Sequence, residues 1–127
     1  MILVDTSIWV HADRDQTSRE AQELDRLIDL DEVATTGMVL AEVLQGIRAE
    51  SRFRRAAFDF TALHYLDARR TTWMRAGELS YSLIRRGMTT PLSDLLIATV
   101  ALENSVSVYA TDAHFSRVDG LQLYIPV

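Results

Sequence analysis

Short apolar runs alternate with segments of helical periodicity along the chain, and this order limits the possible folds more than any other feature. The runs that predict strands are residues 2–4, 33–36, 63–66, 106–110 and 121–125. Helical spacing predicts helices in the later part of 8–30 and over 38–44, 51–63, 71–86 and 94–102. Strands that alternate with helices favour a mostly parallel sheet covered on both faces, so we expect an α/β fold, a three-layer α/β/α sandwich.

Length and composition favour one compact domain over residues 1–127. The chain has 127 residues, 48% of them apolar, which suffices for one hydrophobic core but leaves too little length for two. No internal repeat is visible. The first residues lack a basic stretch followed by a long apolar run, so we expect neither a signal peptide nor a membrane span, and a cytoplasmic protein.

The helix predicted over residues 94–102 should lie at the centre of the fold, because it is apolar nearly all round. Pro91 cannot lie deep inside a helix, and Ser93 is a good N-cap residue, so the helix should begin just after them. Upstream, Gly87 stands where glycine is favoured after the end of a helix and should close the helix over 71–86.

The side chains available to hold a metal are limited. Cysteine is absent, which excludes disulfides and thiolate metal sites. His11, His64 and His114 are scattered along the chain without an evident partner, so we assign them no general-base role. Any metal in this protein should therefore be held by oxygen atoms.

Four acidic residues from distant parts of the chain should converge at one edge of the sheet. Asp5 follows the first strand and Asp112 follows the strand that ends at residue 110, so parallel strands would bring both to the same edge. Glu42 and Asp94 lie in the first turns of helices that begin near that edge. The sequence therefore predicts a cluster of four carboxylates.

Such a cluster needs a cation, because several close carboxylates cost several kcal/mol unless they are neutralised. All-oxygen ligands select hard ions such as Mg²⁺ or Mn²⁺. A bound ion would lower the pKa of a water molecule and offset charge on an attacked phosphate, which favours phosphodiester hydrolysis. A lone Asp at a strand end or in a first helical turn is usually a turn former or cap, so this prediction depends on all four acids together.

Four segments carry a resemblance to a known family. They are Val4-Asp5-Thr6-Ser7, Ala41-Glu42-Val43-Leu44-Gln45-Gly46, Ser93-Asp94-Leu95-Leu96-Ile97-Ala98 and Thr111-Asp112-Ala113-His114-Phe115. In their order and separation the chain resembles the PIN domains and, among them, the VapC toxins of VapBC toxin–antitoxin pairs. The resemblance spans essentially the whole chain.

The resemblance implies a PIN fold, an Mg²⁺- or Mn²⁺-dependent endoribonuclease, a homodimer, and inhibition by a cognate VapB-type antitoxin. By position, the family's catalytic acids correspond to Asp5, Glu42, Asp94 and Asp112, with Asp5 and Asp94 as metal ligands. Thr6 or Ser7 corresponds to the hydroxyl residue that helps to hold the first acid. Ala110 departs from the hydroxyl or His of many relatives, with Thr111 as a substitute, and His114 stands where some relatives have Asp.

The basic residues offer contacts for RNA phosphates. A net charge of −5 counts against a nucleic-acid binder, but local distribution matters more than the sum, and all thirteen basic residues are Arg. Two groups flank the expected cleft: Arg48, Arg52, Arg54 and Arg55 after the Glu42 helix, and Arg85 and Arg86 before Asp94. Of these, we predict RNA contacts for Arg48, Arg52, Arg85 and Arg86, against the alternative of a solvated helix face.

Other functions compete with a toxin RNase. A phospho-acceptor receiver domain needs a Lys, which this chain lacks, and haloacid-dehalogenase-like phosphatases need Asp-x-Asp where the chain has Asp5-Thr6-Ser7. Two alternatives remain: a PIN-domain RNase without an antitoxin, and a catalytically silent PIN fold that serves as an RNA- or protein-binding scaffold. The sequence does not identify the RNA target.

Overall fold

The computed structural model describes residues 1–127 and contains one parallel sheet flanked by helices. The strands are β1 (Ile2–Val4), β2 (Val33–Thr35), β3 (His64–Tyr65) and β4 (Ser107–Tyr109), in the order β3-β2-β1-β4. The helices are α1 (Thr6–Arg14), α2 (Arg19–Asp29), α3 (Gly37–Gln45), α4 (Glu50–Phe60), α5 (Arg70–Arg85), α6 (Leu92–Asn104) and the 3₁₀ helix η1 (Ala113–Arg117). All three strand pairs are parallel, which confirms the predicted α/β fold.

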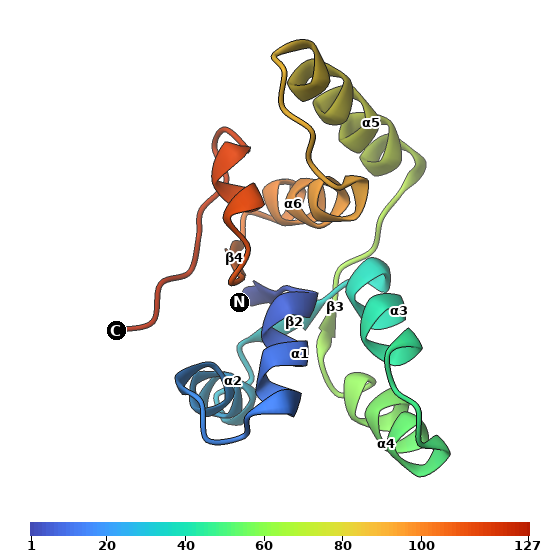
Figure 1. Cartoon of the computed structure of the whole chain (residues 1–127), viewed down its shortest axis with the longest axis vertical. Helices are drawn as coiled ribbons and strands as arrows, with labels where there is room; N and C mark the ends of the chain where they lie inside the picture. Colours follow the sequence, from blue (N-terminus) through green and yellow to red (C-terminus); the bar gives the residue numbers. More distant parts are fainter.

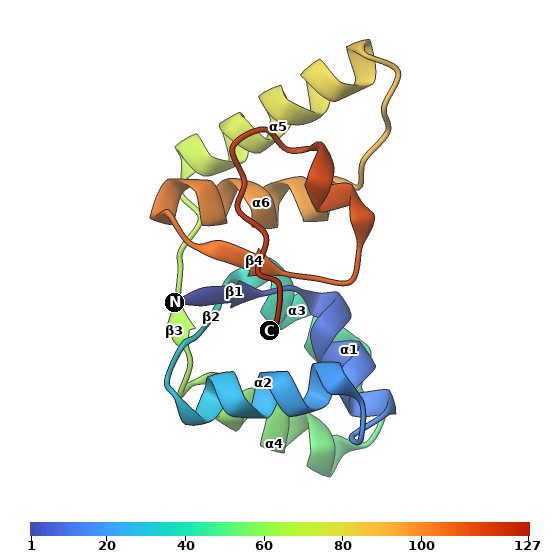
Figure 2. The same cartoon turned by 90° about the vertical axis from the view of Figure 1, so that its left-hand side faces the viewer.

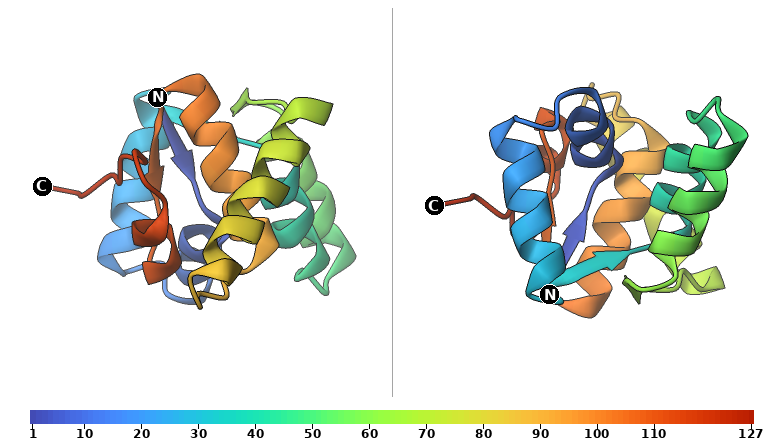
Figure 3. Two further views of the ribbon diagram at one scale, coloured as in Figure 1. Left: turned by 90° about the horizontal axis from the view of Figure 1, so that it is seen from above. Right: turned by 90° about the horizontal axis from the view of Figure 1, so that it is seen from below.

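Each face of the sheet has its own core, because successive strand residues point to opposite faces. Leu3 and Val108 belong to a cluster with buried residues of α6, whereas Val4 and Tyr109 pack with buried residues of α1 and α2. Figures 1 and 2 show α5 and α6 on one side of the sheet and α1, α2 and α4 on the other. The views along the third axis show the same layers (Figure 3).

Helix α6 is the most buried element of the fold. All seven residues from Leu95 to Ala101 are buried. The helix lies between β4 and α5 in Figure 2, so apolar side chains are required around its whole circumference. The predicted central position of this helix is confirmed. No helix of the protein has the length and apolar character needed to cross a lipid bilayer.

The helix predicted in the later part of 8–30 is present as α2, and a further helix, α1, precedes it. Polar side chains interrupt the backbone ladder between the two. The Asp15 carboxylate accepts hydrogen bonds from the backbone N–H and the hydroxyl of Thr17, at 3.0 and 2.7 Å. Ser18 then caps α2 by accepting from the N–H of Ala21 at 3.1 Å. Side-chain hydrogen bonds of this kind compete with helix formation and favour a turn.

Two local predictions were wrong. Pro91 is the N-cap residue of α6, so Ser93 lies inside the first turn instead of capping it. The predicted strand over 121–125 is reduced to an isolated parallel bridge between Val108 and Leu123. The N–H of Tyr124 donates to the carbonyl of Val108 at 2.8 Å, so the segment runs beside β4 without becoming a full strand.

The carboxyl ends of β1 and β4 lie side by side and define the edge where the predicted acids should meet. The N–H of Asp5 donates to the carbonyl of Tyr109 at 2.9 Å, directly after both strands. The start of α1, the start of α6 and η1 lie at this same end of the sheet in Figure 2. Parallel pairing thus brings residues more than a hundred positions apart to one place.

A first prediction concerns the stability that α6 provides. Leu95 is 1% exposed and Leu92, in the same helix, is 54% exposed. Leu95→Ala leaves a cavity and should lower the free energy of unfolding by about 2–5 kcal/mol. The same change at Leu92 should cost less than about 1 kcal/mol. Urea unfolding followed by circular dichroism measures both, and equal losses would contradict a central role for α6.

Candidate metal centre

Asp5 is a buried carboxylate of which only one oxygen atom, Oδ2, accepts hydrogen bonds. It is 3% exposed and forms the N-cap of α1. Its Oδ2 accepts hydrogen bonds from the backbone N–H of Ser7 at 3.0 Å and from the Ser7 hydroxyl at 2.6 Å. Its Oδ1 is buried and has no hydrogen-bond partner. A buried carboxylate oxygen without a partner is costly, so Oδ1 indicates a ligand position.

The Ser7 hydroxyl also ties the ends of two strands together. Its Oγ accepts a hydrogen bond from the backbone N–H of Thr111 at 3.1 Å while it donates to Asp5. Thr111 therefore contributes its backbone N–H, and no side-chain hydrogen bond is formed at this position. Of the hydroxyl residues predicted to support the first acid, it is Ser7 that contacts Asp5.

Asp94, Asp112 and His114 form a compact cluster beside Asp5. The Nδ1 atom of His114 lies 3.0 Å from Asp94 Oδ2 and 2.9 Å from Asp112 Oδ1. The backbone N–H of His114 donates to the same Asp112 oxygen at 2.9 Å. One potential ligand atom from each residue lies within 4.8 Å of the others, so the group could hold a metal ion. The interpretation of His114 as a residue without a partner was wrong.

The carboxylates of this centre repel one another and are shielded from water. Burial is the largest cause that raises the pKa of Asp5, and Asp112 raises it further, against the hydrogen bonds of Ser7. Burial likewise raises the pKa of Asp94, with added repulsion from Asp5 and Asp112 and an opposing hydrogen bond from His114. These acids are therefore close enough to interact electrostatically, and both would gain from a cation.

Glu42 is joined to the centre through Thr6 and is not among the groups that shift the pKa of Asp5 or Asp94. Its Oε1 accepts a hydrogen bond from the Thr6 hydroxyl at 2.8 Å, which joins α3 to the first residue of α1. The half-buried carboxylate thus has a partner, as a charge on an otherwise apolar helix requires. Thr6 orients Glu42, whereas its neighbour Ser7 orients Asp5.

The residues present fit a divalent cation. The donor set consists of carboxylate oxygens and one imidazole nitrogen, contributed by the end of β1, the first turn of α6 and the η1 region. Asp5 supplies a buried oxygen without a protein partner. The positive end of the α6 dipole also favours negative charge at Asp94. No arginine or lysine is among the groups that shift the pKa of Asp5 or Asp94.

Two of the four arginines predicted to contact RNA already have a partner side chain within the protein, and two do not. Arg52 pairs with Asp13, and the Arg85 guanidinium stacks over the Tyr81 ring with 4.5 Å to its centroid. The side chains of Arg48 and Arg86 form no ion pair or hydrogen bond. Arg117, which the sequence analysis did not select, donates to the Thr89 carbonyl at 3.1 Å and so holds the loop that precedes α6.

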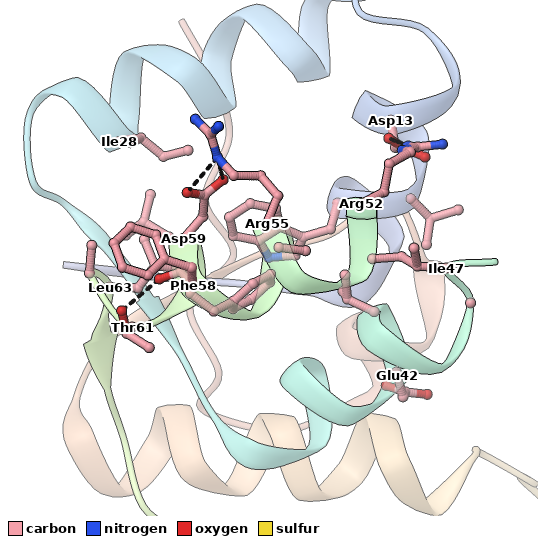
Figure 4. A pocket seen from close by; sticks show the side chains of 18 of the residues that line it. Asp13, Ile28, Glu42, Ile47, Arg52, Arg55, Phe58, Asp59, Thr61 and Leu63 are labelled. Carbon is pink, nitrogen blue, oxygen red and sulfur yellow. Dashed lines mark hydrogen bonds and ion pairs between the residues drawn. The ribbon is translucent and has the colours of Figure 1, made fainter. Parts of the chain in front are cut away.

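A groove of about 970 Å³ lies next to the centre. It is lined by α1, α3 and α4 and by the residues around β2 and β3, and eleven of its twenty lining residues are hydrophobic. Figure 4 shows Glu42 at one end of the groove and Ile28 and Leu63 near the other. Arg52 and Asp13 form an ion pair across it, between α4 and α1. Glu42 is therefore shared by the groove and the candidate metal centre.

The PIN domain profile matches residues 2–121 of the chain. The chain belongs to the PIN domain family. Solved structures support the same fold for this PIN domain. VapBC2 from Rickettsia felis, bound to a DNA fragment from its promoter, is 25% identical over 98% of both chains, with a TM-score of 0.79. DNA-bound VapBC from Salmonella typhimurium is 18% identical, with coverage of 97% and 96% and a TM-score of 0.80.

A third similar structure is a toxin described by its RNA target. VapC20 from Mycobacterium tuberculosis, a toxin that cleaves the sarcin-ricin loop, is 20% identical and covers 99% of this PIN domain and 100% of its own chain, with a TM-score of 0.75. None of the curated protein sequences compared with the chain matches it. The family confirms the expected PIN fold.

A second prediction tests the cost of burying the charge of Asp5. Because burial raises the pKa of Asp5 above its unfolded value of 3.8, the folded protein binds more protons than the unfolded chain between 3.8 and the raised pKa. Ionisation of Asp5 therefore lowers stability above that range. In EDTA at neutral pH, Asp5→Asn should therefore raise the free energy of unfolding.

The gain should disappear as the pH falls below 3.8, where Asp5 is protonated in both states. Asp25→Asn is the matched control, because Asp25 is exposed on α2 and should change stability by less than about 0.5 kcal/mol. Urea unfolding across the pH range measures both variants. A destabilised Asp5→Asn protein at neutral pH would contradict the assignment of an uncompensated charge.

Proposed function

We propose that this PIN domain is a metal-dependent endoribonuclease and the toxin component of a type II toxin–antitoxin system. The observation that carries the proposal is the meeting of Asp5, Asp94 and Asp112 at one sheet edge, with Asp5 Oδ1 buried and without a partner. Membership of the PIN domain family and the likeness to VapC20, a sarcin-ricin loop cleaving toxin, support RNA as the substrate. The proposed compartment is the cytoplasm.

In this mechanism Asp5 and Asp94 hold Mg²⁺ or Mn²⁺, with Asp112 and Glu42 completing the catalytic acids. When bound, the divalent ion acts as a Lewis acid that acidifies water and offsets negative charge on the phosphate. Ser7 keeps Oδ2 of Asp5 occupied, so that Oδ1 remains available. Glu42, oriented by Thr6, is positioned at the edge of the centre to accept a proton from the attacking water.

RNA phosphates are proposed to be bound by arginines around the centre. Arg48 and Arg86 have no competing side-chain partner, whereas Arg52 must leave Asp13 before it can bind RNA. Arg86 and Arg117 line one small cavity between α5, α6 and η1, together with Arg75. Arg75 is paired with Glu103, so Arg86 is the arginine of this cavity that is available for a phosphate.

The proposed antitoxin occupies the groove between α1, α3 and α4. Several of the similar structures are VapBC complexes, in which a toxin is joined to its antitoxin. The groove of this chain offers exposed apolar side chains, of which Phe58 at 73% exposed is the most open, beside charged residues of both signs. An amphipathic segment could bury its apolar face there and pair its charges at the rim.

The homodimer is proposed to form through α5. Trp73, Met74, Tyr81 and Ile84 are all more than half exposed, and their spacing places them on one side of the helix around Gly77. A glycine at the middle of the stripe has open space beyond its Cα, which permits close approach of another chain. Helix α5 lies at the outside of the molecule, away from the groove (Figures 1 and 2).

A third prediction tests the nuclease. Purified total RNA should be cut into discrete fragments with Mg²⁺ or Mn²⁺ and left intact with EDTA. Asp5→Asn and Asp94→Asn are nearly isosteric, and each should lower the cleavage rate by more than about 100-fold, since even residues that only support metal ligands cost 10–100-fold. Asp25→Asn should cleave like the wild type. Equal cleavage by all variants would contradict the proposal and indicate a contaminating nuclease.

Absence of cleavage by folded, antitoxin-free, metal-loaded protein on every RNA tested would favour the scaffold alternative. Cleavage by a protein that has no antitoxin encoded beside it would favour an RNase outside a toxin–antitoxin pair. Co-purification with the product of an adjacent short gene, lost in Phe58→Glu, would support the toxin assignment.

A fourth prediction separates the two proposed interfaces. Ile84 is 59% exposed on α5 and Phe58 is 73% exposed in the groove. Ile84→Glu places a charge in the dimer contact and should yield a monomer in sedimentation velocity, because an unpaired charge at a buried contact is strongly unfavourable. Phe58→Glu should leave the dimer intact. A monomeric wild-type protein would contradict the homodimer, and a dimer unaffected by Ile84→Glu would exclude α5 as its interface.

A further inference from the structure

His114 lies within the carboxylate cluster and contacts two of its acids. Its Nδ1 is within 3.0 Å of Asp94 Oδ2, on α6, and 2.9 Å from Asp112 Oδ1, at the start of η1. The backbone N–H of His114 also donates to Asp112, which fixes the side from which the ring enters. The other ring nitrogen, Nε2, has no partner in the protein. Nδ1 is thus the atom that the fold aims at the two carboxylates.

The two distances from His114 Nδ1 to the carboxylate oxygens are those of neighbouring ligands around one ion. Ligands at roughly 2.1 Å from an octahedral ion and at right angles to one another are about 3 Å apart. The two nitrogen–oxygen distances, 3.0 and 2.9 Å, match this separation. Asp5 lies outside this compact group of three, and its buried Oδ1 has no protein partner.

Nitrogen in the donor set changes which ion the centre favours. Carboxylates and water suit Mg²⁺, whereas imidazole suits divalent transition ions, whose affinity for nitrogen-containing sites rises from Mn²⁺ onward. Neutral imidazole is an effective ligand for these ions through either ring nitrogen. An all-carboxylate centre would distinguish Mg²⁺ from Mn²⁺ less strongly.

We propose that His114 is a direct nitrogen ligand and that the centre therefore selects a divalent transition ion, with Mn²⁺ as the first probe, over Mg²⁺. The inference deepens the metal dependence of the proposed function and rests on the divalent site assigned there. In this proposal the Nδ1 atom of His114 binds the divalent ion directly. The competing interpretation is an imidazolium ion that only forms ion pairs with Asp94 and Asp112.

The experiment measures metal binding without RNA. Metal-stripped, antitoxin-free protein is loaded with Mn²⁺ and studied by electron spin echo envelope modulation, which detects nitrogen bound directly to the ion. The wild type should show the nitrogen signal. His114→Asp, which offers a carboxylate instead, should bind Mn²⁺ without that signal, and His114→Asn provides a neutral variant of similar shape. His11→Gln is the control, because His11 pairs with Glu20 away from the centre, and it should keep the signal.

Competition with Mg²⁺ gives a second readout. Free Mn²⁺ measured by electron paramagnetic resonance during Mg²⁺ titration should show a Mn²⁺ preference that falls about tenfold or more in His114→Asp, as expected when a metal-site side chain is changed. A wild-type Mn²⁺ complex without nitrogen signal, or an unchanged preference in both His114 variants, would overturn the inference. Lack of Mn²⁺ binding by the folded wild type would overturn it as well.

These results are separable from the nuclease proposal. Cleavage of RNA by the wild type without a nitrogen signal would reject the ligand role of His114 and leave the nuclease in place. A nitrogen signal in a protein that cleaves no RNA would establish the mixed-ligand centre and reject the nuclease.

Discussion

The burial of carboxylates close together at one sheet edge is the constraint on which the rest of the structure depends. Burial and mutual charge raise the pKa of Asp5 and of Asp94, and no arginine approaches closely enough to offset either effect. The fold keeps the charges together with neutral hydroxyls, a histidine and the N-terminal end of α6. The hydroxyls and the helix end hold carboxylates without a full counter-charge, so Asp5 in particular would be stabilised by a cation.

Helix α6 shows why the hydrophobic core and the centre cannot be separated. Asp94 lies one residue before the run of seven buried residues, so the packing that stabilises the domain also fixes the position of a ligand. Parallel strand pairing fixes the position of Asp5 in the same way, because the N–H of Asp5 donates to the carbonyl of Tyr109, the last residue of β4. Rigid elements thus hold the carboxylates against their repulsion, as a preorganised site requires.

The parts that could be predicted from the sequence follow from periodicity and from the geometry of parallel sheets. The continuous apolar run of α6 and the acids placed after strands were sufficient to predict the central helix and the meeting of Asp5 with Asp94 and Asp112. The contact between His114 and Asp94 could not be predicted from the sequence, because the two residues are twenty positions apart and meet only through tertiary structure. The separate tasks of Thr6 and Ser7 likewise depend on the direction in which α1 leaves β1.

Glu42 links the two surfaces on which the proposed function depends. It lines the groove and accepts a hydrogen bond from Thr6, the residue that follows Asp5. A segment bound in the groove therefore lies against a carboxylate of the centre without having to enter the cluster of Asp94, Asp112 and His114. Glu42 is therefore the residue at which the groove comes nearest to Asp5 along the chain of contacts that runs from α3 through Thr6.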